Sequence, residues 1–129
     1  MPLHFSWNIN LLFMNLKEKI SSINKEIQSF TVDNYNAMND SLLNKLDELK
    51  TLMVNTYETN EGLNKYMVRI PMWLIDNNLV DFNSPSFNKD REFKDGVVKN
   101  CKKTTTQAIE LFEHACIENS VNTLTQEGF

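Results

Sequence analysis

Glycine and proline are scarce in this chain, which has three of each among 129 residues. So few of them exclude collagen-like and low-complexity linker sequences, and they leave little material for tight turns or for glycine-rich loops that hold phosphates. Hydrophobic residues make up 41% and charged residues 23%, so the chain can form a core and is not compositionally disordered. The length fits one domain, residues 1–129, or one member of a larger assembly.

Basic residues are also in the minority. Thirteen Lys and Arg stand against seventeen Asp and Glu, which gives a net charge of -4. Domains that bind nucleic acids usually carry a basic patch and a high pI, whereas the pI here is about 5.1. The nearest approach to a patch is Lys99, Lys102 and Lys103, which acidic residues flank, and we interpret it as a solvated helix face. No direct nucleic-acid partner is expected.

Cysteine is limited to Cys101 and Cys116, too few for the disulfide framework of a secreted domain. They lie fifteen residues apart in one predicted helix, about 22 Å, which exceeds the ~7 Å limit for a disulfide. We therefore expect reduced thiols and an intracellular protein. Residues 1–16 lack a basic start and a cleavage site, and amides interrupt their short apolar run, so we expect neither a signal peptide nor a membrane span.

Groups that perform chemistry are few. His4 and His114 are the only imidazoles. Glu110 could share a helix face with His114, but a metal site in a helical bundle needs Glu-x-x-His on two helices, and Leu111 occupies the place of that glutamate. Cys116 has no suitable base within a helical turn. Nucleotide-binding and hydrolase motifs do not occur. We expect no enzyme, no catalytic or metal-binding residue, no cofactor and no small-molecule ligand.

Heptad spacing is the strongest positive signal. It predicts a first helix over residues 6–30, a polar connection over 31–39 and a second helix over 40–66, with Asn39, Asp40 or Ser41 as its cap. Joined by a short link, the two helices should pack antiparallel. The apolar positions of the first helix are Ile9, Phe13, Leu16, Ile20, Ile23, Ile27 and Phe30, and those of the second are Leu42, Leu46, Leu49, Met53 and Thr56.

A proline interrupts the pattern at Pro71. Because the residue before proline avoids the helical region, Ile70 should be extended, and Pro71 should begin a short helix over residues 71–77. The apolar residues 72–75 include Trp73, and tryptophan is enriched at interface hot spots. Two interpretations stay open for this cluster: a plug that closes the end of the bundle and an anchor that docks a partner.

The last long helix is predicted over residues 85–119, after a loop at 77–83 and the start signal Ser84-Pro85, and before a frayed tail at 120–129. Its apolar positions are Phe93, Val97, Cys101, Thr104, Ala108, Leu111 and Ala115, and Val98, Ile109, Phe112 and Cys116 lie beside that line. The predicted fold is therefore all-α: an elongated helical bundle or coiled coil of two N-terminal antiparallel helices, a short proline-initiated helix and a long C-terminal helix.

Asparagine is abundant, with 18 residues, and it is a poor helix former. Some of it falls at the predicted links and some, such as Asn24 and Asn44, within the helices. We infer that the helices need tertiary or partner contacts to persist.

The order of these parts resembles subunit 10 of the Mediator complex, the coactivator that bridges transcription factors and RNA polymerase II. Ile70-Pro71-Met72-Trp73-Leu74 takes the place of that family's Ile/Val-Pro-Leu-x-Val segment, and Ser84-Pro85 replaces its Asn-Pro turn. Phe93 and Val97 fall on apolar family positions, and Lys99-Asn100 falls on a Lys-Asn pair. The resemblance covers roughly residues 30–115. The family's glycine in the acidic turn, its Tyr-Thr-x-Glu and a later Gly-Lys pair are absent.

The resemblance implies a non-catalytic scaffold subunit in the nucleus, in the middle module of Mediator. Its partners would be other Mediator subunits and, through them, the RNA polymerase II machinery. The partner-docking residues implied are Ile70, Pro71, Trp73, Leu74, Ser84, Pro85, Phe93 and Asn100.

Two alternatives remain open. One is a generic coiled-coil tether or self-associating helical bundle. The other is a protein that binds a lipid surface through the helix within residues 1–30, although basic residues are few on the polar face of that helix.

Overall fold

The computed structural model describes residues 15–85, 87 and 90–121, and these form helices and turns with no strand. The predicted all-α helical bundle is thereby confirmed. In chain order the elements are α2 (Leu16–Gln28), the 3-10 helix η1 (Val32–Asn34), α3 (Tyr35–Thr59), the 3-10 helix η2 (Glu61–Arg69), α4 (Met72–Ile75), the 3-10 helix η3 (Asn77–Val80) and α5 (Arg91–Glu118).

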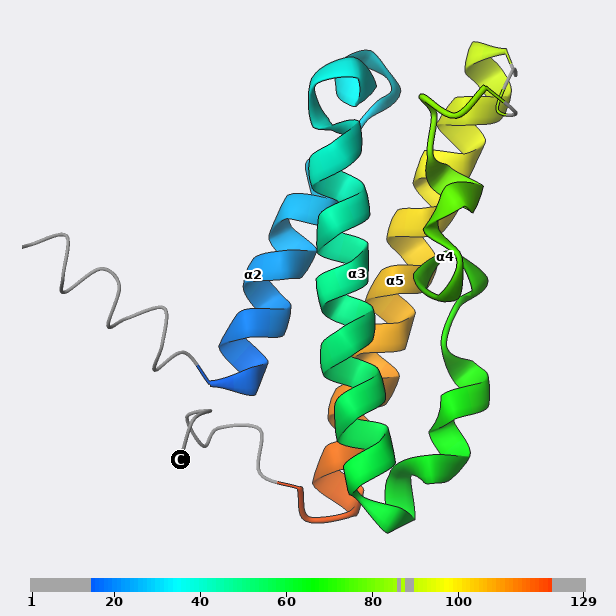
Figure 1. Ribbon diagram of the computed structural model, residues 1–129. Helices are drawn as coiled ribbons and strands as arrows, with labels where there is room; N and C mark the ends of the chain where they lie inside the picture. The colour runs from blue at the N-terminus through cyan, green and yellow to red at the C-terminus, as the bar shows by residue number, and fades with distance from the viewer. Residues whose placement is uncertain (1–14, 86, 88–89, 122–129) are drawn as a thin grey trace, which may run out of the picture.

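The long helices lie side by side in an elongated bundle (Figure 1). Helices α2 and α3 run antiparallel, as predicted, and α5 packs against α2 and the segment η2–α4–η3. That segment turns back at the end of α3 and runs along the side of the bundle away from α2. Both α3 and α5 contact it, so it forms a fourth, broken layer of the bundle.

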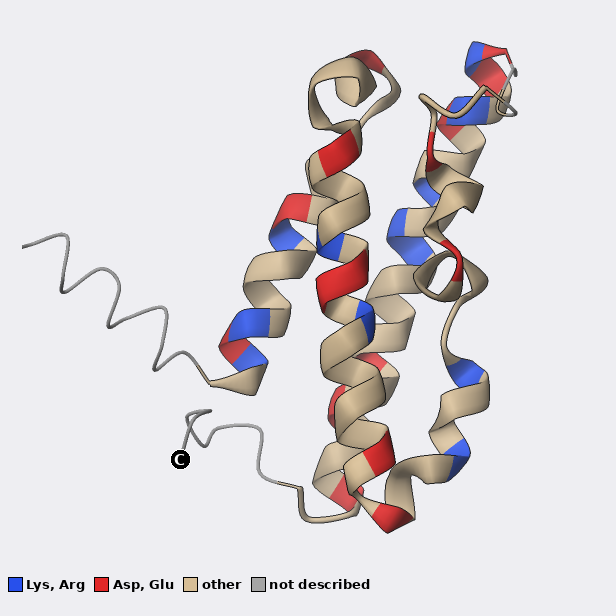
Figure 2. Cartoon of the chain, viewed as in Figure 1, with Lys and Arg blue, Asp and Glu red and all other residues tan. Residues whose placement is uncertain are grey.

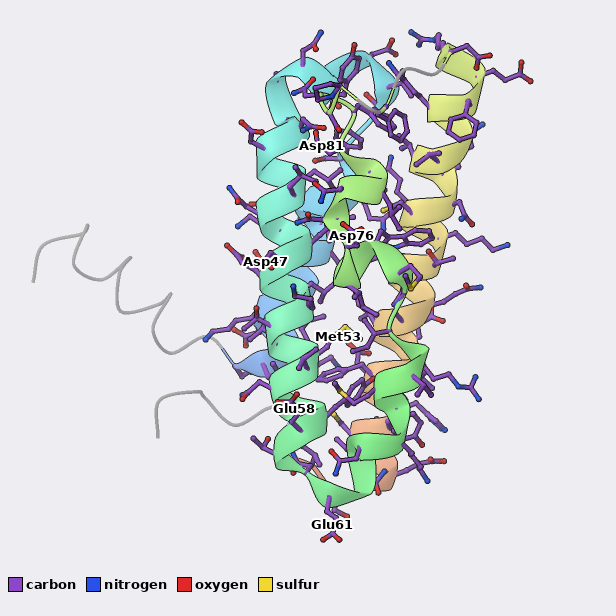
Figure 3. The ribbon with its side chains drawn as sticks, turned by 45° about the vertical axis from the view of Figure 1, so that its right-hand side comes forward. Asp47, Met53, Glu58, Glu61, Asp76 and Asp81 are labelled. Carbon is purple, nitrogen blue, oxygen red and sulfur yellow. The ribbon has the colours of Figure 1, made fainter. Side chains whose placement is uncertain are left out.

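The core follows the predicted apolar positions of α2 and α3. Ile20, Ile27, Leu46 and Leu49 are almost completely buried, and Met53 points into the interior (Figure 3). Burial of such side chains is the main favourable term in folding, at about 1.5–3 kcal/mol for each large aliphatic side chain. Ile9 and Phe13, the first two positions of the predicted series, lie outside the described residues.

The buried face of α5 contains most of the predicted apolar residues but is centred to one side of the predicted line. Phe93 is half exposed, and Val97, Thr104 and Leu111 are only partly buried. The fully buried positions are Val98, Cys101, Thr105, Ala108, Ile109, Phe112, Ala115 and Cys116. Both lines have 4-3 spacing, and the side on which neighbours pack decides between them. Cys101, Ala108 and Ala115 of the predicted line are buried, as are the residues predicted beside it, whereas Thr104 and Leu111 lie at the edge of α5 beside Pro71, Met72 and Trp73.

The start of α3 corrects the predicted connection. A capping box closes the turn before it: the Asn34 amide donates to Thr31 Oγ1 at 3.3 Å, and the Thr31 amide donates to Asn34 Oδ1 at 2.7 Å. The helix therefore begins at Tyr35, about five residues before the predicted start. Asn39, one of the predicted caps, lies buried inside α3 instead.

Other boundaries also move. The second predicted helix ends at Thr59, and Glu61–Arg69 continues as a 3-10 helix. Ile70 is extended, as predicted, but the short helix spans only Met72–Ile75, and a 3-10 helix replaces much of the predicted loop. The start of α5 moves from 85 to Arg91, because Asp90 accepts the Phe93 amide at 2.8 Å and caps the helix there.

The predicted end of the last helix agrees with the structure to within a residue. Helix α5 ends at Glu118, and Asn119 is its C-cap. Most of the predicted tail, 122–129, lies beyond the described part of the chain.

Candidate docking groove between α4 and α5

The cluster after Pro71 divides into buried and exposed residues. Ile70 is 7% exposed and Leu74 is 1% exposed, so these two side chains hold the segment against the core. Met72 and Ile75, on the same short helix, are 62% and 55% exposed. Ile70 and Leu74 therefore pack into the core along the side of the bundle instead of closing its end, whereas Met72 and Ile75 remain outside, and the docking interpretation stays a prediction.

Four exposed apolar residues lie along the η2–α4–η3 segment, and we call them the apolar stripe: Val68, Met72, Ile75 and Leu79. Extended residues at Ile70 and Asp76 separate the three short helices, so the stripe follows the segment and is not one helix face. Single exposed apolar residues are ordinary on protein surfaces, whereas adjoining ones mark interaction sites. The stripe is thus the strongest surface signal of a partner in the described part of the chain.

Beside the stripe lies an open groove of about 400 Å³, the α4–α5 groove. One wall comes from the end of η2 and the start of α4, and the other wall is the edge of α5. Met72 belongs to both the stripe and the groove. The lining residues are Arg69, Pro71, Met72, Trp73, Thr104, Gln107, Ala108 and Leu111.

Trp73 is half-buried, and its Nε1 is buried without a hydrogen-bond acceptor among the described residues. Buried indole N–H groups normally have an acceptor, because an unpaired buried donor destabilises the fold by about 1–3 kcal/mol. The ring packs against the core and lines the groove. Trp73 thus belongs both to the margin of the core and to the groove lining.

The groove lining contains one charged side chain, and exposed residues of both signs flank it on α5. The charged residue of the lining is Arg69. Lys103 lies one helical turn before Gln107 on the outer edge of α5, and both cations are exposed. Neither takes part in an ion pair within the described ranges, whereas Lys99 pairs with Asp95. Glu110, three residues after Gln107, is exposed as well, and Figure 2 shows acidic and basic residues along both η2 and α5.

The structure brings together some of the predicted docking residues. Pro71 and Trp73 line the groove, and Asn100 is exposed on α5 one turn before Thr104, whose hydroxyl donates to the Asn100 carbonyl at 2.8 Å. Phe93 lies further toward the start of α5. The predicted pair Ser84 and Pro85 lies before α5, outside the groove lining, where the Ser84 amide donates to the Asp81 carbonyl at 3.1 Å.

Sequence reasoning did not single out Arg69 or Gln107, and it predicted core positions for the other lining residues of α5. Thr104, Ala108 and Leu111 were assigned to the core line of α5. One signal in the sequence could have identified this edge of the helix. A single line at 4-3-4 spacing contains Asn100, Thr104, Gln107 and Leu111. Because most of these residues are polar, the line is typical of the edge of a helix rather than of its core face.

A second groove, of about 420 Å³, lies between α2 and α3 and differs in its electrostatics. Its lining includes Lys45, Asp47 and Glu48. Lys45 Nζ is 3.4 Å from both Glu26 and Glu48, so its charge is already balanced. This groove resembles an ordinary solvated helix face more than a docking site.

The titratable groups of the bundle do not form a reactive centre in the described ranges. Burial raises the pKa of both Cys101 and Cys116 to about 11, so both are neutral thiols near pH 7. His114 contacts Glu118 at 3.0 Å. Within the described residues no group of three or more His, Cys, Asp or Glu is placed to hold a metal ion, and no helix combines the length and apolar character needed to cross a bilayer.

The fold and the groove define a class: a small helical bundle with an exposed apolar stripe beside an open groove. No family model, curated protein or solved structure matches the chain.

Proposed function

We propose that this chain is a non-catalytic scaffold subunit of the nuclear Mediator complex and regulates RNA polymerase II transcription through helical contacts with neighbouring subunits. The observation that carries the proposal is the apolar stripe. It occupies residues 68–79, which contain the Ile70-Pro71-Met72-Trp73-Leu74 segment on which the resemblance to Mediator subunit 10 depends.

The physical argument for a partner is the exposure of the stripe. Four large apolar side chains, between 46% and 85% exposed, lie along one segment of a small protein. Burial of apolar surface is favourable by roughly 25 cal/mol per Å², so a partner that covers the stripe stabilises the bundle as well as the complex. The scarcity of reactive groups, with both thiols buried and neutral, supports a role without catalysis.

Co-purification tests the proposal. A tagged full-length chain is expressed in its own cells, and the captured proteins are identified by mass spectrometry. Other Mediator subunits should be recovered with the wild type and largely lost with the double variant Met72→Ser, Ile75→Ser. Ile117→Ser is the matched control, because Ile117 is 76% exposed but lies outside the groove lining. Capture without any Mediator subunit would contradict the assembly proposed.

Sedimentation of the isolated chain separates this proposal from a self-associating bundle. A scaffold subunit that lacks its partners should be monomeric or aggregate weakly through the stripe. A stable homodimer that Met72→Ser and Ile75→Ser dissociate would favour the self-associating bundle instead.

A further inference from the structure

We propose that Met72 is a site of reversible oxidation, and that conversion of its thioether to the sulfoxide blocks the docking of a partner on the apolar stripe. The inference rests on the proposed function in taking the stripe as a partner surface. It adds a modification site and a means of regulation, which the resemblance does not supply.

Exposure distinguishes Met72 from the other methionines that the structure describes. Met72 is 62% exposed, whereas Met53 is 1% exposed, and Met38 and Met67 are partly buried against the core. An oxidant in solution reaches an exposed sulfur directly, but it reaches a buried sulfur only when the structure opens locally. Met72 should therefore react first among these four residues.

The reaction is a two-electron oxidation of sulfur by a peroxide. The O–O bond of hydrogen peroxide breaks, one oxygen forms an S–O bond with Met72 Sδ, and the other oxygen leaves as water. Sulfur is oxidised and the peroxide is reduced. Methionine sulfoxide reductases reverse the step: two thiols supply two electrons and become a disulfide, and the sulfoxide oxygen is released as water. The modification can therefore act as a switch.

Met72 lies where the apolar stripe meets the α4–α5 groove. It is a member of the stripe, together with Val68 and Ile75, and it lines the groove beside Trp73. A partner that covers the stripe therefore buries the Met72 side chain. The sulfoxide brings a polar S–O group into this apolar contact, and burial of a polar group without a hydrogen bond is unfavourable. Oxidation should weaken docking for this reason.

The bundle itself should tolerate oxidised Met72. Because the side chain is exposed in the unbound chain, its sulfoxide remains in contact with water. The segment is held against the core by Ile70 and Leu74, which are 7% and 1% exposed and contain no sulfur. Oxidation of Met53 would instead place a polar group in the core and destabilise the fold. Preserved folding is thus what separates a switch at Met72 from oxidative damage.

The first experiment measures reactivity. The purified full-length chain is treated with hydrogen peroxide, digested at successive times, and analysed by mass spectrometry for sulfoxide at each methionine. We expect Met72 to react at least about tenfold faster than Met53, and faster than Met38 and Met67. Chains with Met72 oxidised and Met53 intact should keep their Tm, and a methionine sulfoxide reductase should restore Met72. Equal rates at Met72 and Met53 would overturn the inference.

The second experiment measures the apolar surface without a partner. Retention of the folded chain on a phenyl-agarose column should fall when the wild type is oxidised. Met72→Leu is the matched control, because leucine is apolar and similar in volume and every other methionine stays open to the oxidant, so its retention should fall much less. Met72→Gln introduces a polar side chain in place of the sulfoxide and should elute early without any oxidant.

Co-purification with the same set of proteins tests docking. Oxidised wild type and Met72→Gln should recover at least about tenfold less of the Mediator subunits than the untreated wild type, and treated Met72→Leu should recover them nearly in full. If oxidation reduces retention and recovery as strongly in Met72→Leu as in the wild type, the switch does not lie at Met72.

The two proposals fail in different ways. Equal recovery of Mediator subunits by oxidised and untreated wild type would refute the switch and leave the assembly standing. A loss of retention that depends on Met72, with no Mediator subunit recovered by the untreated chain, would refute the assembly and leave the oxidation site standing.

Discussion

Asn39 and Asp81, 42 residues apart, are joined side chain to side chain: Asn39 Nδ2 donates to Asp81 Oδ1 at 2.7 Å. The Asn39 Oδ1 also accepts the Phe82 amide, at 3.0 Å. One buried amide on α3 thus holds the loop after η3 against the bundle and satisfies a buried backbone donor. The connection also fixes the loop from which the chain continues toward α5.

Replacing this amide should destabilise the whole bundle. Asn39→Ala leaves the buried Phe82 N–H without an acceptor and removes the bond to Asp81. We expect unfolding to become easier by about 2 kcal/mol, measured by urea denaturation, since an unpaired buried donor costs about 1–3 kcal/mol. Asn36→Ala, on the exposed side of the same helix, is the control and should change the stability little. Equal effects at both positions would contradict the role assigned to Asn39.

Ser120 offers a simple route to higher stability. It has a φ of 58°, in the left-handed region, at the position after the C-cap of α5. The Val121 amide donates to the Cys116 carbonyl at 2.8 Å and the Ser120 amide to that of Ile117 at 3.2 Å, which is the pattern of a Schellman motif. Ser120→Gly should stabilise the protein by about 1 kcal/mol, because glycine adopts this conformation without steric cost. Thermal unfolding should show a higher Tm for Ser120→Gly and no gain for Ser120→Ala.

The two described glycines should respond oppositely to alanine. A Cβ at Gly62 would lie 2.6 Å from Asn119 Oδ1, and the Asn119 side chain is held by its bond to the Ala115 carbonyl at 2.8 Å. Gly62→Ala should therefore destabilise the contact between η2 and the end of α5, by about 1 kcal/mol if that hydrogen bond is lost. Gly96, within α5, has nothing within 4 Å of the added Cβ, so Gly96→Ala should stabilise by about 0.5–1 kcal/mol. Circular dichroism melts of both variants test the opposite signs.

The buried thiols predict a pH dependence. The pKa of Cys101 and Cys116 is raised from 9.0 to about 11, mainly by burial. The unfolded chain therefore ionises first. The stability associated with the neutral thiols is complete below about pH 9 and is lost as the pH rises toward about 11. Native protein at pH 8 should also react slowly with a thiol reagent, and urea should accelerate the reaction strongly. Rapid labelling of the native chain would contradict the burial of both thiols.

Much of the fold could be predicted because an amphipathic helix places its apolar residues at a regular spacing that is visible in the local sequence. The apolar series of α2 and α3 were identified residue by residue, and so was the extended conformation of Ile70 before Pro71. The start of α5 was misplaced because Ser84-Pro85 and Asp90 both offer start signals, and only the packing of the preceding loop shows which is used. Of the candidate site, Pro71 and Trp73 were identified, whereas Arg69 and Gln107 were not, since their grouping depends on two segments that are distant in sequence.

The sequence by itself determined the helical class, the buried faces of α2 and α3 and the apolar cluster after Pro71, because each depends on neighbours within about two turns. Tertiary structure alone decided three other features. Thr105 of α5 is buried and Thr104 lies at its edge, Asn39 holds a loop instead of capping a helix, and Met72 is exposed whereas Leu74 is buried. These depend on contacts between residues far apart in the chain, and a local pattern admits several such pairings. The groove exists because α5 presents its edge to α4, and that rotation is a property of the assembled bundle.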